Sequence, residues 1–270
     1  MNIIEKKDID FDSLSKYECT VHTESNLFYD DNYMYKMFNE DASKSYLLRK
    51  KVKLEALSDG TPLDSAILPI DIIMDNKVLS GYTMNYIKNA TPIFKFNSKN
   101  NSINDFFRLM YGVSLSLRNI HNDPRNIVVG DLSISNIIFD ENMKHYFSDF
   151  DSVMIGKLHE DRVPLALDRY ARRCGLNRYD INKSTDRLCL ILATLFVVFN
   201  KSIEEVSMRE YDKTAEKVET IKNMRQIVVE LKKHNAPVSD FPYLDELISD
   251  SVSQTKKKIK TTTENIQNIR

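Results

Sequence analysis

The chain has 270 residues, which is enough for one large domain or two small ones with buried cores. Its 38 basic and 39 acidic side chains give a formal net charge of -1, which excludes a strongly basic surface for nucleic acid and a polyanionic tail. We therefore expect no nucleic-acid partner.

The first 87 residues have the pattern of a small β-rich region with one helix. Residues 1–14 alternate charged and aliphatic side chains and are expected to form a peripheral cap. Short apolar runs between polar turns predict strands at 17–21, 27–29, 33–38, 66–73 and 77–86. The composition of residues 43–57 predicts a helix between the third and fourth of these strands.

Lys36 lies inside the predicted strand Tyr33–Phe38, where an unpaired ammonium group is costly to bury. The predicted helix carries Glu55 as the acid of its later turns. We predict an ion pair between Lys36 and Glu55. The alternative is that Glu55 belongs to the solvated face of a basic helix.

Residues 88–270 are expected to be mainly helical. Apolar side chains recur at helical spacing in residues 106–121, and the apolar run at 188–199 predicts a buried helix. Further helices are predicted at 202–230 and 241–252. Ser184 is a candidate N-cap for the buried helix, and Asp186 an acid in its first turn.

Three short apolar strands are predicted between these helices, at Ile127–Val129, Ile137–Phe139 and Tyr146–Phe147. Asp131, Asn136 and Asp149 lie at or just beyond strand ends, and each offers an oxygen of the kind that a hard cation with bound phosphates requires. A single aspartate in such a loop is more often a turn residue or a cap. The combination of all three favours phosphate chemistry.

The motif Gly130-Asp-Leu132, with Asn136 and then Asp149-Phe-Asp151, resembles the catalytic centre of the protein kinase-like superfamily. The resemblance implies an α+β, two-lobed protein kinase-like fold, with a β-rich N-lobe (1–87), a mainly helical C-lobe (88–270) and ATP between them. It implies that Asp131 is catalytic and faces the acceptor hydroxyl, and that Asn136 and Asp149 hold Mg²⁺. Protein kinases usually have arginine at the position of Gly130. The Gly130-Asp131 pair resembles aminoglycoside and choline kinases instead.

The resemblance also assigns cofactor-binding residues in the first region. Lys36 would contact the ATP phosphates and would be held by Glu55. The strand at 77–86 would lead into a hinge beside the adenine, which implies contacts from Met84, Asn85, Tyr86 and Ile87. The turn that is glycine-rich in the family contains no glycine here, so the hydroxyls of Thr23 and Ser25 would have to contact phosphate.

Two further aspartates have open roles. Asp151 stands where the family has glycine, and it could add a carboxylate to the metal site or cap the following turn. Asp186 matches a family position that holds the catalytic loop backbone from beneath. By physics alone it is a first-turn acid stabilised by the helix dipole, and both roles can hold.

The expected function is ATP- and magnesium-dependent transfer of a phosphoryl group to a hydroxyl of a protein or small-molecule acceptor. Two alternatives remain open. One is a pseudokinase that acts as a nucleotide-binding or protein-interaction module, which the missing glycines favour. The other is an AMP transferase, which this fold supports when ATP sits reversed.

Localisation is expected to be cytoplasmic, with no membrane partner. The segment Met1–Asp8 is charged from its start and lacks the apolar core of a signal peptide. The run Leu188–Phe199 is too short to cross a hydrocarbon core of about 30 Å as a helix. The three cysteines show no metal-binding spacing, which favours a reducing compartment.

Overall fold

The computed structural model describes residues 1–18, 25–96, 102–158, 167, 181–201, 205–215, 218–233 and 241–249. The chain divides into two compact units, which are residues 1–90 with 147–151, and residues 91–146 with 152–270. The sequence-based division placed everything after residue 87 in the second region. Residues 147–151 instead belong with the first unit, because Phe147 forms backbone hydrogen bonds with Ser65 and Ile67.

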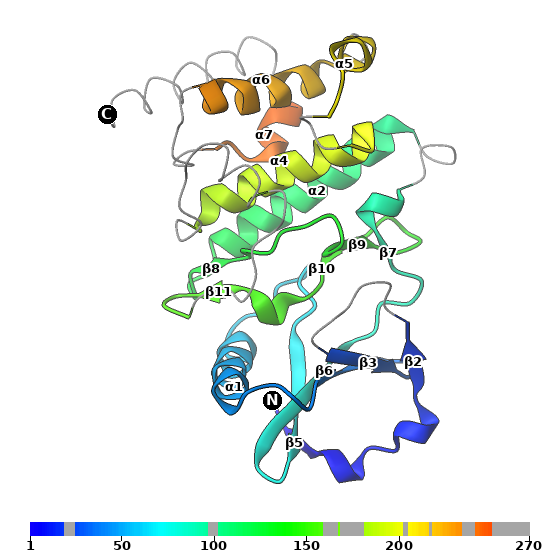
Figure 1. Ribbon diagram of the computed structural model, residues 1–270, viewed down its shortest axis with the longest axis vertical. Coiled ribbons are helices and arrows are strands. Elements are labelled where there is room, and N and C mark those ends of the chain that lie inside the picture. The colour runs from blue at the N-terminus through cyan, green and yellow to red at the C-terminus, as the bar shows by residue number, and fades with distance from the viewer. Residues whose placement is uncertain are drawn as a thin grey trace. The chain divides into compact units, whose positions relative to one another are not determined.

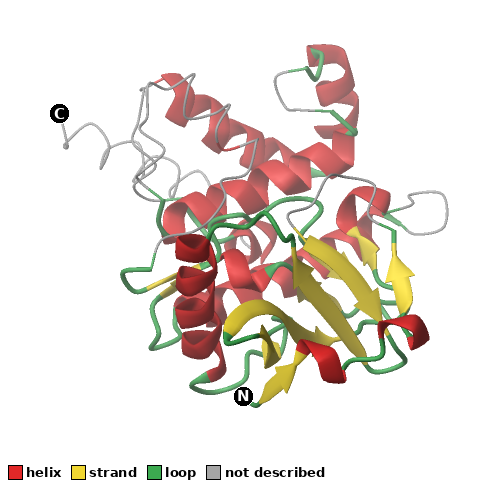
Figure 2. Cartoon of the chain, turned by 60° about the horizontal axis from the view of Figure 1, so that its bottom comes forward, coloured by secondary structure: helices red, strands yellow, loops and turns green. Residues whose placement is uncertain are grey.

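A mixed sheet forms the framework of the first unit, and Figure 2 draws its strands in yellow. Within the described residues, six strands lie in the order β1-β5-β6-β4-β3-β2. Their bounds are β1 Ile3–Glu5, β2 Ser15–Tyr17, β3 Ser25–Tyr29, β4 Tyr33–Phe38, β5 Pro69–Asp75 and β6 Val78–Asn85. The pair β1 and β5 is parallel, and the other described neighbours are antiparallel.

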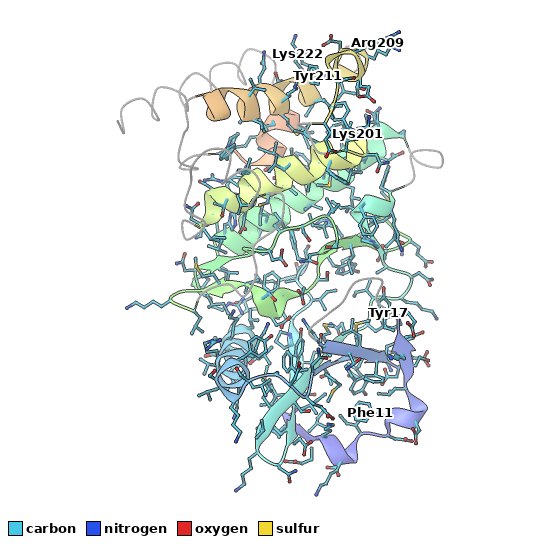
Figure 3. All side chains as sticks on the ribbon, viewed as in Figure 1. Phe11, Tyr17, Lys201, Arg209, Tyr211 and Lys222 are labelled. Carbon is cyan, nitrogen blue, oxygen red and sulfur yellow. The ribbon has the colours of Figure 1, made fainter. Side chains whose placement is uncertain are left out.

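The N-terminal residues contribute a strand to this sheet, in addition to the surface segment predicted for residues 1–14. Ile3 pairs with Ile72 of β5, and the Asn2 N–H donates to the Asp71 carboxylate at 2.7 Å. The strand has three residues, which is too few to give the alternating pattern from which strands are predicted. Two 3₁₀ turns follow, and Phe11 in the second packs edge-on against Phe28, with ring centroids 5.2 Å apart (Figure 3).

Helix α1 (Lys44–Ser58) packs against β5 and β6 of the same unit, as Figure 1 shows. The Ser43 hydroxyl caps its N-terminus by accepting a hydrogen bond from the Tyr46 N–H at 3.3 Å. This confirms the helix predicted at 43–57. Its buried residues include two lysines together with two leucines: Lys50, Lys53, Leu54 and Leu57.

The second unit is mainly helical in its described part. Its helices are α2 Ile103–His121, α4 Lys183–Phe199, α5 Met208–Ala215, α6 Glu219–Lys233 and α7 Leu244–Ser249. The N-cap of α4 is Asn182, whose side chain accepts hydrogen bonds from the N–H groups of Ser184 and Thr185. The prediction of Ser184 as the cap was therefore wrong, because the helix begins two residues earlier than that cap would allow.

Packing between the later helices uses aromatic and charged side chains. Tyr211 of α5, labelled in Figure 3, packs on Phe199 at the end of α4, and the Arg225 guanidinium of α6 stacks 3.9 Å from its ring centroid. Lys201 forms an ion pair of 2.8 Å with Glu210. Among the described residues, no helix combines the length and apolar character needed to cross a membrane.

Short strands frame the loops that carry the predicted site residues. Strand β8 (Ile127–Val128) pairs antiparallel with β11 (Met154–Ile155), and β9 (Ile137–Phe139) lies between β7 (Thr91–Pro92) and β10 (His145–Phe147). The loop from β8 to β9 carries Asp131 and Asn136. The turn after β10 carries Asp149 and Asp151.

Candidate functional site

The carboxylate of Asp186, in the first turn of α4, binds the backbone of the loop that carries Asp131. Its Oδ2 atom accepts a hydrogen bond from the Val129 N–H at 2.7 Å, and Oδ1 accepts one from the Gly130 N–H at 2.8 Å. Asp186 is completely buried. Gly130 has φ +71°, a left-handed conformation that suits glycine. These bonds agree with the contact that the resemblance implied for Asp186.

His121, at the end of α2, supports the same carboxylate. Its Nε2 atom lies 2.9 Å from Asp186 Oδ2, and since a carboxylate only accepts, Nε2 carries the proton. Its Nδ1 atom lies 2.8 Å from the Tyr243 hydroxyl. The sequence does not reveal this support, because the three residues come from segments far apart in the chain.

Asp131 and Asn136, two of the predicted site residues, are hydrogen-bonded to each other. The Asn136 Nδ2 group donates to the Asp131 backbone carbonyl at 3.0 Å and to its carboxylate at 3.2 Å. The amide oxygen of Asn136 accepts from the Ser135 hydroxyl at 3.3 Å. The loop thus orients the Asp131 carboxylate with an amide donor, on a backbone that Asp186 holds.

Lys36 and Asp149 also come together, within the first unit. Lys36 of β4 is 5% exposed, and its ammonium donates to Asp149 Oδ1 and to Asp151 Oδ1, the latter at 2.8 Å. Burial alone would lower the pKa of Lys36, but Asp151 and then Asp149 raise it well above its usual value. The neighbouring carboxylates therefore favour the charged form of this buried lysine.

The predicted ion pair between Lys36 and Glu55 was wrong. The Glu55 side chain is 53% exposed, and its carboxylate lies 3.9 Å from the Lys51 ammonium on the same helix. The physical reason is the orientation of α1, which turns Lys50 and Leu54 toward the interior and leaves Glu55 outside the buried face. The alternative, a glutamate on the solvated face of the helix, describes the structure.

Asp151 is the carboxylate that the buried lysines share. Its Oδ1 atom accepts from Lys36 and, at 2.8 Å, from the Tyr82 hydroxyl, while Oδ2 accepts from the Lys50 ammonium at 2.5 Å. Burial alone would raise the pKa of Asp151, but the two ammonium groups hold it well below its usual range. Both open roles for this residue were wrong, because its oxygens are bound to these donors rather than directed at a metal or a turn.

Asp149 has features that suit a metal ligand. Its φ of +56° places it in the left-handed region, an uncommon conformation for a residue other than glycine. Its side chain is 28% exposed, and Oδ2 has no hydrogen-bond partner among the described residues. Mg²⁺ is commonly held by one or two carboxylates together with substrate phosphates, so the Asp149 carboxylate is a suitable type of ligand. Among the residues that the structure describes, no group of three or more His, Cys, Asp or Glu side chains is arranged to hold a metal ion.

The residues predicted to contact adenine have mixed outcomes. The Tyr86 N–H donates to the Asn32 carbonyl at 2.9 Å, so this group is not available to a base, contrary to expectation. Met84 is buried and pairs with Met34 and Pro69, and Asn85 pairs with Tyr33. The Ile87 carbonyl accepts from the Ala90 N–H at 3.3 Å, and a contact of Ile87 with adenine stays a prediction.

The hydroxyls of Ser25 and Thr23 were expected to contact phosphate. Ser25 is the buried first residue of β3 and pairs with Phe38, so its contact with phosphate stays a prediction. Thr23 lies outside the described residues.

Comparison with protein-family profiles found no family that matches the chain, and a search of curated proteins found no matching protein. Because no related protein was found, the functional assignment depends on two groups of contacts within the chain. In the first unit, Lys36 binds Asp149 and Asp151. In the second, Asp186 holds the backbone beside Asp131, which is bonded to Asn136.

Proposed function

We propose that the protein is an ATP- and magnesium-dependent phosphotransferase with a two-lobed protein kinase-like fold. The observation that supports this best is the ion pair between Lys36 and Asp149. These are the residues that the resemblance assigns to the ATP phosphates and to the metal. They are 113 positions apart in sequence, so their pairing does not follow from local chain geometry.

In this function the first unit binds the nucleotide phosphates. Mg²⁺ supplies positive charge that offsets the charge of the phosphate oxygens. Lys36 donates to these oxygens from a strand inside the sheet, so little reorganisation is needed when the nucleotide binds. Asp149 offers the oxygen that Lys36 does not use, and Asn136 offers its amide oxygen.

Asp131 acts on the acceptor. Its carboxylate orients the acceptor hydroxyl and takes its proton as the phosphoryl group is transferred. Asn136 orients that carboxylate, and Asp186 fixes the backbone of the loop. The acceptor is a protein or a small molecule with a free hydroxyl.

The test compares Mg²⁺-dependent ATP binding with transfer of label from the γ-phosphate, for the wild type, Asp149→Asn and Asp131→Asn. Acceptor probes are the protein itself, a generic protein mixture, an aminoglycoside and choline. Asp149→Asn should weaken Mg²⁺-dependent binding, because the cation loses a charged oxygen. Asp131→Asn should leave binding nearly intact but reduce transfer by about 10²-fold or more, the usual scale for losing a positioned acid or base.

Two results would contradict the assignment. Transfer of label from the α-phosphate, and not from the γ-phosphate, would identify an AMP transferase. A wild type that binds nucleotide and transfers nothing, with both variants binding equally well, would identify a nucleotide-binding module.

A further inference from the structure

We infer, on the basis of the proposed function, that Asp151 is the positioning residue that holds the Lys36 ammonium for phosphate contact, and that Lys50 is the counter-cation that makes this possible. The expected partner of Lys36 was Glu55, which lies on the exposed side of α1. The same helix instead contributes an ammonium group to the buried cluster.

The geometry around Asp151 leaves its carboxylate little freedom. Donors reach it from three elements, namely Lys36 of β4, Lys50 of α1 and Tyr82 of β6. Both carboxylate oxygens are bound, and the Lys50 ammonium also lies 3.2 Å from the Asp151 backbone carbonyl. A carboxylate fixed from three sides fixes in turn the ammonium that binds to it.

Charge balance explains why Lys50 is needed. Lys36 alone would face two carboxylates, Asp149 and Asp151, and one buried negative charge would remain without a partner, which is costly. Lys50 adds the second cation, so the cluster of two lysines and two aspartates is neutral. The more exposed Asp149 can then exchange Lys36 for other partners when ligand binds, while the buried Asp151 keeps its hold on the lysine.

A purely structural role for the cluster predicts a different response to mutation. We therefore compare Asp151→Asn, Lys50→Met and the double variant, with Glu55→Gln as the matched control, in melting temperature, KM for ATP and kcat. Each single variant leaves a buried charge unpaired and should melt lower. The double variant removes opposite charges together, so its melting temperature should recover toward that of the wild type.

Activity should not recover in the double variant. Because Lys36 has lost its fixed partner, kcat/KM for ATP should stay lower by at least about tenfold, since small misplacements at a reacting centre are costly. Glu55→Gln should match the wild type. Recovery of both melting temperature and kcat/KM in the double variant would overturn the positioning role, as would a loss confined to Glu55→Gln.

A readout without nucleotide separates this inference from the proposed function. Acylation of Lys36 by an amine reagent, followed by mass spectrometry, should be slow in the wild type and in Glu55→Gln. In the double variant it should rise about tenfold, because the side chain has lost the buried carboxylate that fixes it and reaches the reagent more often. Equal labelling of wild type and double variant would overturn the inference. Failure of the wild type to bind Mg²⁺-ATP would overturn only the proposed function.

Should the double variant not fold, Tyr82→Phe provides the test. It removes one donor to Asp151 Oδ1 without changing a charge. The remaining bonds hold the carboxylate less firmly, so kcat/KM for ATP should fall about fivefold, the scale of one hydrogen bond. An unchanged kcat/KM in this variant would contradict a positioning role.

Discussion

Asp186 and Asp151 are both buried carboxylates that each accept from three donor groups, yet the donors differ in kind. Asp186 accepts from two backbone N–H groups and from His121, all within the second unit. Asp151 accepts from two ammonium groups and a phenol hydroxyl, all within the first. One carboxylate therefore fixes the course of a loop, and the other fixes the positions of charged side chains.

The two arrangements differ in what a mutation leaves behind. Without Asp186, backbone N–H groups of the loop lose their partners, at about 1–3 kcal/mol for each buried group. Without Asp151, two lysines are left in the interior, and Lys50 loses its carboxylate partner. Breaking a buried ion pair in this way typically costs about 3–5 kcal/mol. The ionic cluster thus loses charge compensation, whereas the loop loses hydrogen bonds of neutral groups.

The largest effect is expected for Asp151→Ala. The free energy of unfolding should fall by about 3–5 kcal/mol, measured by urea denaturation, because the buried ammonium groups are no longer offset. The matched control is Asp75→Ala, since Asp75 forms a half-exposed pair with Lys6 at 3.6 Å. The control should change stability by less than about 1 kcal/mol. A similarly small change in the free energy of unfolding of Asp151→Ala would show that the buried lysines do not depend on Asp151.

A smaller loss is expected for Asp186→Asn. The amide keeps one accepting oxygen, so one of the two loop N–H groups loses its partner, at about 1–3 kcal/mol. Hydrogen exchange should locate the change, with faster exchange at the Val129 or Gly130 amide and little change in the sheet of the first unit. Unaltered protection of both amides would contradict the assignment of Asp186 as their acceptor.

The contacts of these two carboxylates also show which interactions can be predicted from the sequence. The contact of Asp186 was predictable because its motif lies in one short segment, at the start of a strongly apolar helix. The partners of Asp151 come from β4, α1 and β6, and no local pattern specifies which side of α1 faces the sheet. Glu55 was selected as the partner of Lys36 because it is the acid of the helix's later turns and because the resemblance implies such a pair. Nothing in the sequence indicated that this helix buries Lys50 and Lys53 beside its leucines.

The same limit explains the outcomes for the fold. Long periodic segments were predicted well, as in α2, whose observed bounds Ile103–His121 include the predicted 106–121. The three-residue strand β1 was missed because its place in the sheet depends on pairing with β5, some 70 residues later. Local signals thus identify elements and motifs, whereas the partners of charged side chains depend on tertiary packing.

Acid titration should separate the two units. His145 lies 2.8 Å from the Ser116 hydroxyl, and burial lowers its pKa from 6.5 to about 4, with a further contribution from Lys144. A lowered folded-state pKa gives stability that is complete above the unfolded value and is lost as the pH falls from 6.5 toward 4. Because the ring is partly exposed, we expect a loss of about 1–2 kcal/mol over this window.

The pKa of Asp151 is also lowered, so its contribution is lost only as the pH falls below the ordinary carboxyl value of 3.8. The first unit should therefore lose stability at a lower pH than the second. His145→Gln, which takes up no proton, should remove the loss between pH 6.5 and 4 and leave the more acidic one. If this variant still loses stability between pH 6.5 and 4, that loss belongs to a group other than His145.

The smallest effect is expected for Glu55→Gln, and it sharpens the contrast between sequence and structure. Glu55 interacts with Lys51 at 3.9 Å on an exposed helix surface, and pairs of this kind contribute about 0.3–0.5 kcal/mol. The free energy of unfolding should therefore change by less than about 0.5 kcal/mol. Raising the salt concentration should reduce even this difference, because exposed charges are screened. A loss as large as that of Asp151→Ala would mean that Glu55, and not Asp151, is the acid that holds Lys36.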